Sequence, residues 1–268
     1  MKSRRKKANT IMPEIQALEK AFWKSISLNT KNLNEAAVLF SGGLDSAIIA
    51  KAVSGKVKNT VLFCAGIESS KDITEARKTA EKMKLRIVER IISEKEIPQA
   101  LKTVKKLLSP LKLDDSLNLQ IAVSEFFAMQ AVRQAGFKVA FMGQGADELF
   151  AGYDAFRKIV QEKGLKAVNA ECEKFLQKAS RIDLKRDKAI AMHFGLELRL
   201  PYCEKNFAKL ALKIPAGEKI KSEKDFLRKH ALRKLAKKIG VPKECYSRPK
   251  KAIQYGSGIG KKVKELIN

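Results

Sequence analysis

The chain has 268 residues, of which 55 are lysine or arginine and 29 are aspartate or glutamate, so its formal net charge is +26. It contains no run of about 18 apolar residues, which argues against a membrane-spanning helix. The basic N-terminus lacks the apolar segment of a signal peptide, and we therefore expect a cytoplasmic protein. The positive charge attracts polyanions, which makes RNA one candidate partner.

Helical spacing of apolar residues begins early, because Ile15, Leu18, Phe22 and Ile26 form one stripe within residues 14–26. This stripe predicts a helix that packs on a sheet. Apolar strand-like runs and helix-like segments then alternate. We expect strands at 36–40, 60–66, 85–91 and 137–142, and helices at 47–53, 72–83, 96–108 and 119–132. Such alternation predicts a parallel sheet with right-handed crossovers and a ligand at the carboxyl ends of its strands.

The four cysteines, Cys64, Cys172, Cys203 and Cys245, lie far apart and include no C-x-x-C pair. This spacing argues against a zinc ribbon, a redox dithiol or a disulfide framework. We expect them to be small, buried, apolar residues.

The first predicted strand runs directly into Ser41-Gly42-Gly43-Leu44-Asp45-Ser46. Two adjacent glycines let the backbone turn closely, and the N–H groups of the loop then point to the same place as the positive end of the following helix. We therefore expect a phosphate there, with hydroxyl donors from Ser41 and Ser46. Asp45 is better explained as a ligand for Mg²⁺. For the Gly-Gly pair alone, a turn that merely needs glycine is the alternative.

A second glycine-rich segment follows the strand predicted at 137–142. Gly143 and Gly145 allow a close approach of the backbone, and Asp147 is expected in the same crevice as Asp45. Two carboxylates from separate strand ends that face one polyphosphate would make a Mg²⁺ site. A glycine-rich loop in which Asp147 only caps a helix is the alternative.

Two further sites follow from position alone. Ala65 and Gly66 end the second predicted strand, where adenine or ribose could meet backbone groups, although a glycine that simply ends a strand fits equally well. Asp115 or Ser116 is expected to cap the helix that continues through 119–132, and a direct substrate role for the acidic cluster at the start of this helix is the alternative.

Together the two loops resemble the synthetase domain of asparagine synthetase, a family of the PP-loop ATP pyrophosphatase superfamily. Ser41 to Ser46 is similar to the PP-loop, and residues 143–148 resemble the family motif Ser-Gly-Glu-Gly-Ser-Asp-Glu. Further matches follow in the same order at Arg186-Asp187, 195–202, 223–228 and 248–256. The similarity spans residues 14–260, and the last segment looks closest to the divergent asparagine-synthetase-domain-containing branch.

The resemblance implies an α/β fold, a doubly wound parallel sheet of the PP-loop (HUP-like) type with a helical C-terminal region. Residues 1–33 would be a basic arm and packing helix, and residues 34–164 the PP-loop nucleotide-binding core. Residues 165–268 would complete the same synthetase domain, with 184–199 and 226–238 as the clearest helices.

It also implies an ATP-dependent, AMP-forming ligase that adenylates a carboxylate, by default that of aspartate, for attack by ammonia or an amine. ATP and Mg²⁺ would be its cofactors. The residues implied to hold pyrophosphate, nucleotide and Mg²⁺ are Ser41, Gly42, Gly43, Asp45, Ser46, Gly143 and Asp147. Lys224 matches the family lysine that stabilises charge on the phosphates. Arg199 is expected to pair with carboxylates, and the role of Arg248 is left open.

Two departures from the family pattern matter. Lys2 stands where glutamine-using members have the cysteine of a glutaminase domain, so we expect free ammonia, an amine on the substrate or a separate glutaminase subunit. Gln144 replaces a glutamate, and because an amide cannot act as a general base we expect it to position the substrate by hydrogen bonding. Two other functions stay open: a PP-loop tRNA-modifying enzyme, favoured by the net charge, and a non-catalytic nucleotide-binding relative.

Overall fold

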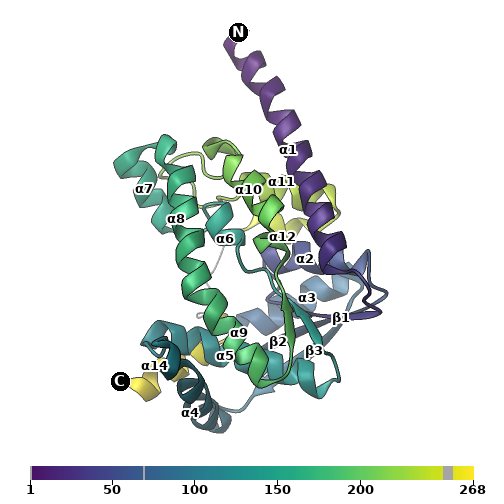
Figure 1. The fold of residues 1–268 in the computed structure, drawn as a ribbon, viewed down its shortest axis with the longest axis vertical. Coiled ribbons are helices and arrows are strands. Elements are labelled where there is room, and N and C mark those ends of the chain that lie inside the picture. Colours follow the sequence, from purple (N-terminus) through teal and green to yellow (C-terminus); the bar gives the residue numbers. More distant parts are fainter. Residues whose placement is uncertain (1, 69, 250–255) are drawn as a thin grey trace.

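The computed structural model describes residues 2–68, 70–249 and 256–268, with residues 2–13 as backbone only. Its centre is one sheet of parallel strands (Figure 1). The strand order is β3-β2-β1-β4-β5. The strands are β1 (Glu35–Leu39), β2 (Asn59–Ile67), β3 (Arg86–Ile92), β4 (Val139–Phe141) and β5 (Glu197–Arg199). Ala37 of β1 pairs with both Val61 of β2 and Ala140 of β4, so β1 lies at the middle of the sheet.

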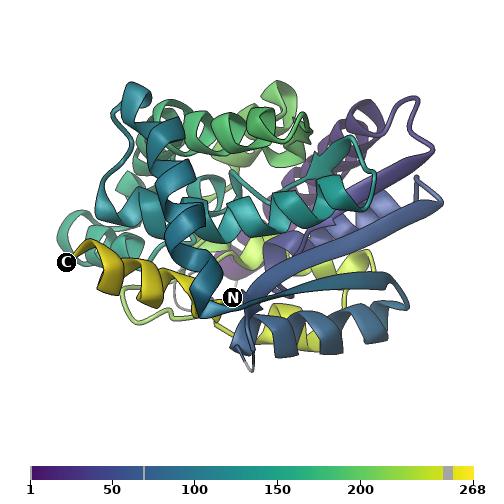
Figure 2. The ribbon, with the colours of Figure 1, turned by 90° about the horizontal axis from the view of Figure 1, so that it is seen from below.

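Helices occupy most of the rest of the described chain. They are α1 (Lys2–Asn29), α2 (Leu44–Ser54), α3 (Lys71–Met83), α4 (Ile97–Leu108), α5 (Ser116–Gln134), α6 (Ala146–Leu149), α7 (Ala155–Lys163), α8 (Val168–Arg181), α9 (Asp183–His193), α10 (Lys205–Lys213), α11 (His230–Lys238), α12 (Lys243–Ser247) and α14 (Ile259–Ile267). Helices lie on both sides of the sheet, which is seen obliquely in Figure 2. The predicted doubly wound α/β fold is therefore confirmed.

Alternate residues of the buried strands supply two separate hydrophobic cores. In β1 and directly after it, Val38 and Phe40 face the core formed with α1, α2, α3, α10 and α11. Ala37 faces the opposite core, formed with α4, α5, α9 and α14. Both faces of the strand are apolar because a parallel sheet is covered on both sides.

The connectivity places a topological switch point beside β1. The chain passes from β1 through α2 to β2 and through α3 to β3, and then returns across the sheet to β4 on the other side of β1. Ligands of open parallel sheets bind where the strand order reverses, outside the carboxyl ends of the strands. The loops that follow β1 and β4 meet at that position.

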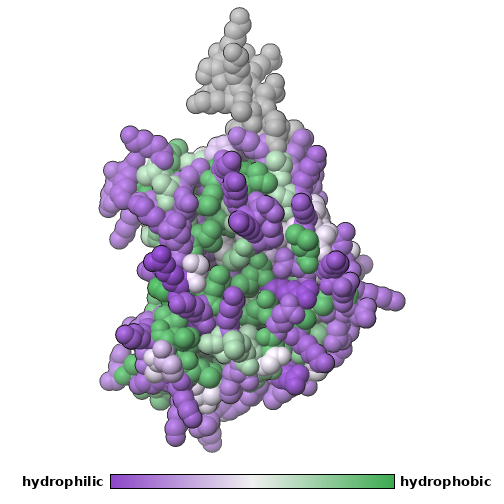
Figure 3. Space-filling view, in the orientation of Figure 1, coloured by the Kyte–Doolittle hydropathy of each residue, from purple (hydrophilic) through white to green (hydrophobic). Residues whose placement is uncertain are grey.

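The N-terminal helix is longer than predicted, because α1 runs from Lys2 to Asn29 and its first turns extend beyond the rest of the molecule (Figure 1). Leu18, Phe22 and Ile26 of the predicted stripe are buried in the first core. None of the described helices is long and apolar enough to cross a membrane. On the face seen in Figure 3, hydrophilic side chains dominate the edges and apolar ones gather near the middle.

The C-terminal half contains one strand that the sequence pattern did not predict. The helix expected at 184–199 ends at His193, and β5 then pairs in parallel with β4 through Val139 and Glu197. Gly195 adopts a left-handed backbone conformation with φ +64°, which stops the helix and turns the chain into the sheet. The expectation of a continuous helix to residue 199 was therefore wrong.

Candidate active site

The loop after β1 has the strand-loop-helix form that its sequence predicts. Gly42 has φ +67°, and a Cβ there would lie 2.8 Å from backbone atoms of Glu75 and Ala76, so only glycine fits. The hydroxyl oxygens of Ser41 and Ser46 are 3.2 Å apart, beside the first turn of α2. Free N–H groups at a helix start and paired hydroxyls form a suitable cradle for an anion.

The loop after β4 packs directly against this cradle. A Cβ at Gly143 would lie 3.1 Å from the Cβ of Asp45 and 3.3 Å from the amide nitrogen of Ser46. Gly145 has φ +95°, and a Cβ there would lie 2.8 Å from Cys203 Sγ. Both glycines are thus needed for the approach of neighbouring protein segments, and the predicted contact of Gly143 with a nucleotide stays a prediction.

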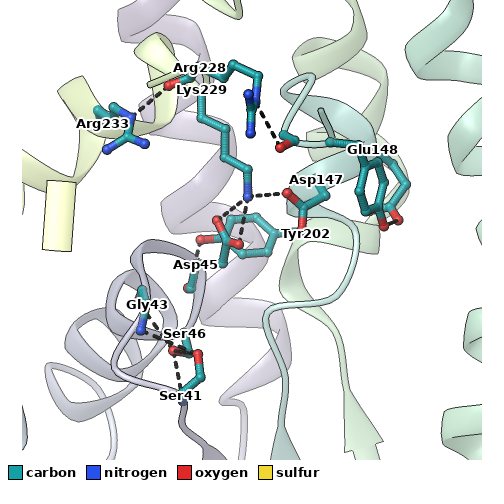
Figure 4. Close-up of polar contacts among 12 residues, drawn as sticks. Ser41, Gly43, Asp45, Ser46, Asp147, Glu148, Tyr202, Arg228, Lys229 and Arg233 are labelled. Atoms are coloured by element: carbon teal, nitrogen blue, oxygen red, sulfur yellow. Dashed lines mark hydrogen bonds and ion pairs between the residues drawn. The ribbon is translucent and has the colours of Figure 1, made fainter. Parts of the chain in front are cut away.

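Asp45 and Asp147 converge on a single ammonium group, that of Lys229 (Figure 4). Lys229 Nζ lies 2.7 Å from each carboxylate oxygen of Asp45 and 2.8 Å from Asp147 Oδ1. The lysine side chain is 2% exposed, whereas those of Asp45 and Asp147 are 21% and 15% exposed. The two acids singled out from separate strand ends therefore lie at one point, which is open to solvent on the carboxylate side.

Electrostatics keep Lys229 charged despite its burial. Burial by itself lowers the pKa of the ammonium group, but the adjacent carboxylates of Asp147 and Asp45 outweigh it, and the pKa is raised. An unpaired buried ammonium would be strongly unfavourable, so the lysine and the two acids form a mutually dependent cluster.

Sequence reasoning selected Lys224 rather than Lys229. Lys224 is exposed, and among the described contacts none joins its side chain to Asp45 or Asp147. Its catalytic assignment stays a prediction. Lys229 lies in a basic segment in which the sequence alone does not distinguish one lysine from another. The only feature of the local sequence that marks its position is that it lies next to the helical pattern that becomes α11.

A strained turn directs Lys229 inward. The helix predicted from Phe226 begins only at His230, because Arg228 and Lys229 both adopt left-handed conformations, with φ +48° and +52°. Such conformations cost about 1–3 kcal/mol for residues other than glycine and persist only where surrounding contacts hold them. Arg228 Nε donates to the carbonyl oxygen of Gly152 at 3.1 Å, which ties the turn to the loop that carries Asp147.

Arg233 and Asp225 hold the same turn from both ends. The Arg233 guanidinium donates to the carbonyl oxygens of Leu227 at 2.5 Å and Arg228 at 2.7 Å. The Asp225 carboxylate accepts from the backbone N–H of Arg228 at 3.1 Å and lies 2.6 Å from His230 Nε2. Because these groups restrain the backbone on both sides of Lys229, we describe Asp225 and Arg233 as positioning residues.

Replacing Asp225 with asparagine is expected to lower the free energy of unfolding by about 1–2 kcal/mol near neutral pH. Burial raises the pKa of the Asp225 carboxyl, but hydrogen bonds from the Lys221 N–H, His230 and the Arg228 N–H outweigh this effect and lower the pKa from 3.8 to about 2. Stability from this group is therefore fully present above pH 3.8 and is lost as the pH falls towards 2. Denaturant unfolding of both proteins across this range tests this.

Glu223→Gln, a change of a partly exposed carboxylate in the same loop, is the matched control and should leave the stability nearly unchanged. A destabilisation by Asp225→Asn that persists unchanged near pH 2 would contradict the assigned ionisation.

A buried acid, Glu148, lies beside the carboxylate pair. Glu148 is 2% exposed and accepts a hydrogen bond from the hydroxyl of Tyr153 at 2.5 Å. Burial and the neighbouring charge of Asp147 raise the pKa of Glu148 to about 7. On the other side, the Tyr202 hydroxyl donates to the backbone carbonyl of Asp45 at 3.2 Å, so α6 and the segment after β5 both support the site.

The remaining predicted site residues, Gly66, Ala65 and Gln144, lie in different environments. A Cβ at Gly66 would lie 2.5 Å from Ser70 Oγ, which places this glycine against the start of α3. Ala65 is half-buried beside the second core. The Gln144 side chain donates no described hydrogen bond, but the backbone carbonyl oxygen of this residue accepts from Cys203 Sγ at 3.6 Å. The assignments of Ala65 and Gly66 to the nucleotide and of Gln144 to substrate stay predictions.

Three expectations of local structure can be compared directly with the contacts. Asp115 caps α5 by accepting from the N–H of Asn118 at 3.2 Å, as predicted. Arg199 pairs with the carboxylate of Glu197, as predicted. Arg248, left open, donates to the carbonyl of Gly42 at 2.6 Å and so supports the first loop. Residues 250–255 of the matching C-terminal segment lie outside the described residues.

The cysteines are free thiols, and Cys64, Cys172 and Cys245 are buried as expected, whereas Cys203 is half-buried. Burial is the main cause that raises the pKa of the Cys203 thiol to about 12. These observations favour packing roles for the thiols.

The parallel sheet, the glycine-serine loop at the switch point and the carboxylate from the neighbouring strand define an α/β protein of the PP-loop nucleotide-binding class. The chain belongs to the asparagine synthase family, whose family model matches residues 17–166 and 160–268.

Several curated proteins are similar to it. A protein of Methanocaldococcus jannaschii that carries the name "Putative asparagine synthetase (glutamine-hydrolyzing) 1" is 30% identical over 270 residues, covering 90% of this chain and 49% of that protein. Human asparagine synthetase (glutamine-hydrolyzing) is 31% identical over 227 residues, with 81% and 39% covered. Asparagine synthetase (glutamine-hydrolyzing) 2 of Lotus japonicus is 27% identical, with 91% and 43% covered. The chain thus spans about half or less of the length of these relatives.

Proposed function

We propose that this chain is an ATP-dependent, AMP-forming ligase that adenylates a carboxylate, with aspartate as the first candidate, for attack by ammonia or an amine. The observation that carries the proposal is the convergence of Asp45 and Asp147 at 2.7 and 2.8 Å from one cationic atom, beside a loop built for an anion. Membership of the asparagine synthase family supports the choice of carboxylate activation over other uses of ATP.

The reaction would have two steps. A carboxylate oxygen of the substrate attacks the α-phosphorus of ATP, the bond to the bridging oxygen breaks, and pyrophosphate leaves. The amine then attacks the acyl carbon of the adenylate, the bond from this carbon to the phosphate oxygen breaks, AMP leaves with the bonding electrons, and the nitrogen loses a proton to solvent. Ser41, Ser46 and the N–H groups of their loop would bind the departing pyrophosphate and stabilise its charge.

The residues present fit Mg²⁺. Asp45 and Asp147 provide two carboxylates on one cation-binding point, and Mg²⁺ typically takes one or two protein carboxylates together with phosphate oxygens and water. When bound, Mg²⁺ would neutralise charge on the pyrophosphate. Gln144, between the two close-packed glycines of the β4 loop, would hold the substrate by hydrogen bonding and not by removing a proton.

The test is release of pyrophosphate and AMP from ATP and Mg²⁺ in the presence of aspartate or other carboxylates, with and without ammonium. We expect stoichiometric AMP and pyrophosphate with one carboxylate, and a loss of at least about a hundredfold in rate for Asp45→Ala and for Asp147→Ala. Mass spectrometry of products made with ¹⁵N-ammonium would identify the amide.

Asp114→Ala provides a matched control, because Asp114 accepts a hydrogen bond from Ser109 and lies in the loop before α5. It should retain the wild-type rate. Unchanged pyrophosphate release in both Asp45→Ala and Asp147→Ala would remove the pair from the reaction, and an absence of pyrophosphate release with every carboxylate would refute the ligase proposal.

A further inference from the structure

Lys229 makes the contacts that a metal ion would otherwise make at the carboxylate pair. Its ammonium group touches both oxygens of Asp45 and one oxygen of Asp147, all within 2.8 Å. In Figure 4 the side chain descends from the start of α11 and ends between the two acids, above the glycine-serine loop. The pair carries two formal negative charges, and this one lysine cancels half of them.

The surrounding structure is built to deliver this side chain. Lys229 and Arg228 hold left-handed conformations, a costly arrangement for two successive residues that are not glycine. Gly152 leaves the space through which the lysine stem passes, because a Cβ there would lie less than 3 Å from Lys229 Cε. A lysine that merely formed a surface ion pair would need neither feature.

We propose that Lys229 is a built-in counter-ion that occupies the carboxylate pair until nucleotide arrives, so that a divalent cation enters only together with the triphosphate. The inference rests on the proposed function for the identity of the pair as the Mg²⁺ site. The phosphates provide the lysine with a new partner, and its long flexible stem lets the ammonium group shift from carboxylate to phosphate oxygens. Lys229 would then contact the leaving pyrophosphate.

The charge balance explains why the cation would need the nucleotide. With Lys229 in place the cluster has a net charge of −1, and a divalent ion would have to displace or approach an ammonium group at close range. Repulsion between cations at such distances is strong in a partly buried site, where water screens it less. The triphosphate removes this obstacle because it adds negative charge and further oxygen ligands at the same time.

The experiment measures Mn²⁺ binding without turnover, by the electron paramagnetic resonance signal of free Mn²⁺. Wild-type protein should bind Mn²⁺ weakly alone and tightly with a non-hydrolysable α,β-methylene analogue of ATP. Lys229→Met should bind Mn²⁺ alone at least about tenfold more tightly than wild type, because the competing cation is gone. Adding Asp45→Asn to Lys229→Met should abolish that gain.

Lys221→Met, which removes an exposed lysine of the same loop, is the matched control and should behave as wild type. Lys229→Arg, which keeps a cation, should also bind little Mn²⁺ alone. Equal nucleotide-free affinity in wild type and Lys229→Met would overturn the proposal. If Lys229→Met does not fold, tight nucleotide-free binding by the wild type that is lost in Asp45→Asn would overturn it equally well.

These outcomes are separate from those of the ligase test. The Mn²⁺ measurements require no carboxylate substrate and no product. They ask only whether Mn²⁺ binding depends on nucleotide in the wild type and no longer does so in Lys229→Met. A chain that released no pyrophosphate could still show the counter-ion, and an active ligase could still bind Mn²⁺ without nucleotide.

Discussion

Replacing Gly152 with alanine is expected to lower the free energy of unfolding by about 3 kcal/mol or more and to reduce pyrophosphate release at least about a hundredfold. A Cβ at this position would lie less than 3 Å from Asp147 Oδ1 and from Lys229 Cε, which are two members of the same cluster. The backbone of Gly152 has no freedom to retreat, because its N–H donates to the Asp147 carbonyl and its own carbonyl accepts from Arg228.

The expected loss of stability has two causes. Overpacking by one methyl group costs about 1–3 kcal/mol, and separating Lys229 from a carboxylate leaves an incompletely paired buried charge that costs more. Denaturant unfolding would report the stability, and pyrophosphate release the activity.

Gly217→Ala is the matched control, since Gly217 is exposed and none of the described residues has a heavy atom within 4 Å of a Cβ there. It should change stability by no more than about 0.5–1 kcal/mol. A Gly152→Ala protein as stable and active as wild type would show that the two loops can separate without cost, which is incompatible with a cluster held by close packing.

The parallel sheet could be predicted because β1, β2 and β4 contain apolar runs, β3 has apolar residues among its charged ones, and helical segments separate each strand from the next. The fifth strand could not, because β5 has only three residues, and the strand-like spacing of Leu196 and Leu198 is too short to stand out beside the helix that precedes it. Its position depends on pairing with β4, a partner more than fifty residues away in the sequence. Short strands whose formation depends on a distant partner leave little local signal.

The meeting of Asp45 and Asp147 could be expected, since both follow strands that end at the same edge of the sheet. Lys229 could not be expected, because its inward direction depends on the left-handed turn at residues 228–229. Arg233 donates a hydrogen bond to the carbonyl oxygen of Arg228, and Arg228 itself donates to the Asp225 carboxylate and to the distant carbonyl of Gly152, so these contacts hold the turn. A propensity-based reading instead continues the helix through these residues, as the expected helix at 226–238 did.

Lys219 provides the opposite case, a buried lysine whose removal is expected to stabilise the protein. Its side chain is fully buried, and among the described residues its ammonium group has one hydrogen-bond acceptor, the carbonyl oxygen of Leu212 at a long 3.4 Å. Burial lowers the pKa of Lys219 from 10.5 to about 8, which means that carrying the charge in the folded state is unfavourable. Methionine has a similar length, is unbranched and adapts to the space left by the lysine stem.

We therefore expect Lys219→Met to raise the free energy of unfolding by about 2–3 kcal/mol near pH 7. Because the folded pKa is below the unfolded one, the penalty in wild type is fully present below pH 8 and fades as the pH rises from 8 to 10.5. The advantage of the variant should shrink over the same range. Denaturant unfolding of both proteins near pH 7 and near pH 10 measures this.

Lys221→Met, at an exposed lysine two residues along the chain, controls for the removal of a positive charge from a protein of net charge +26 and should change stability by less than about 0.5 kcal/mol. A destabilised Lys219→Met protein would mean that the ammonium group has a favourable partner. A gain that is equal at both pH values would point instead to improved packing, because only an ionisation produces a pH-dependent difference. Lys219 and Lys229 are both almost fully buried, so the contrast between them tests whether nearby carboxylates decide when a buried lysine stabilises this fold.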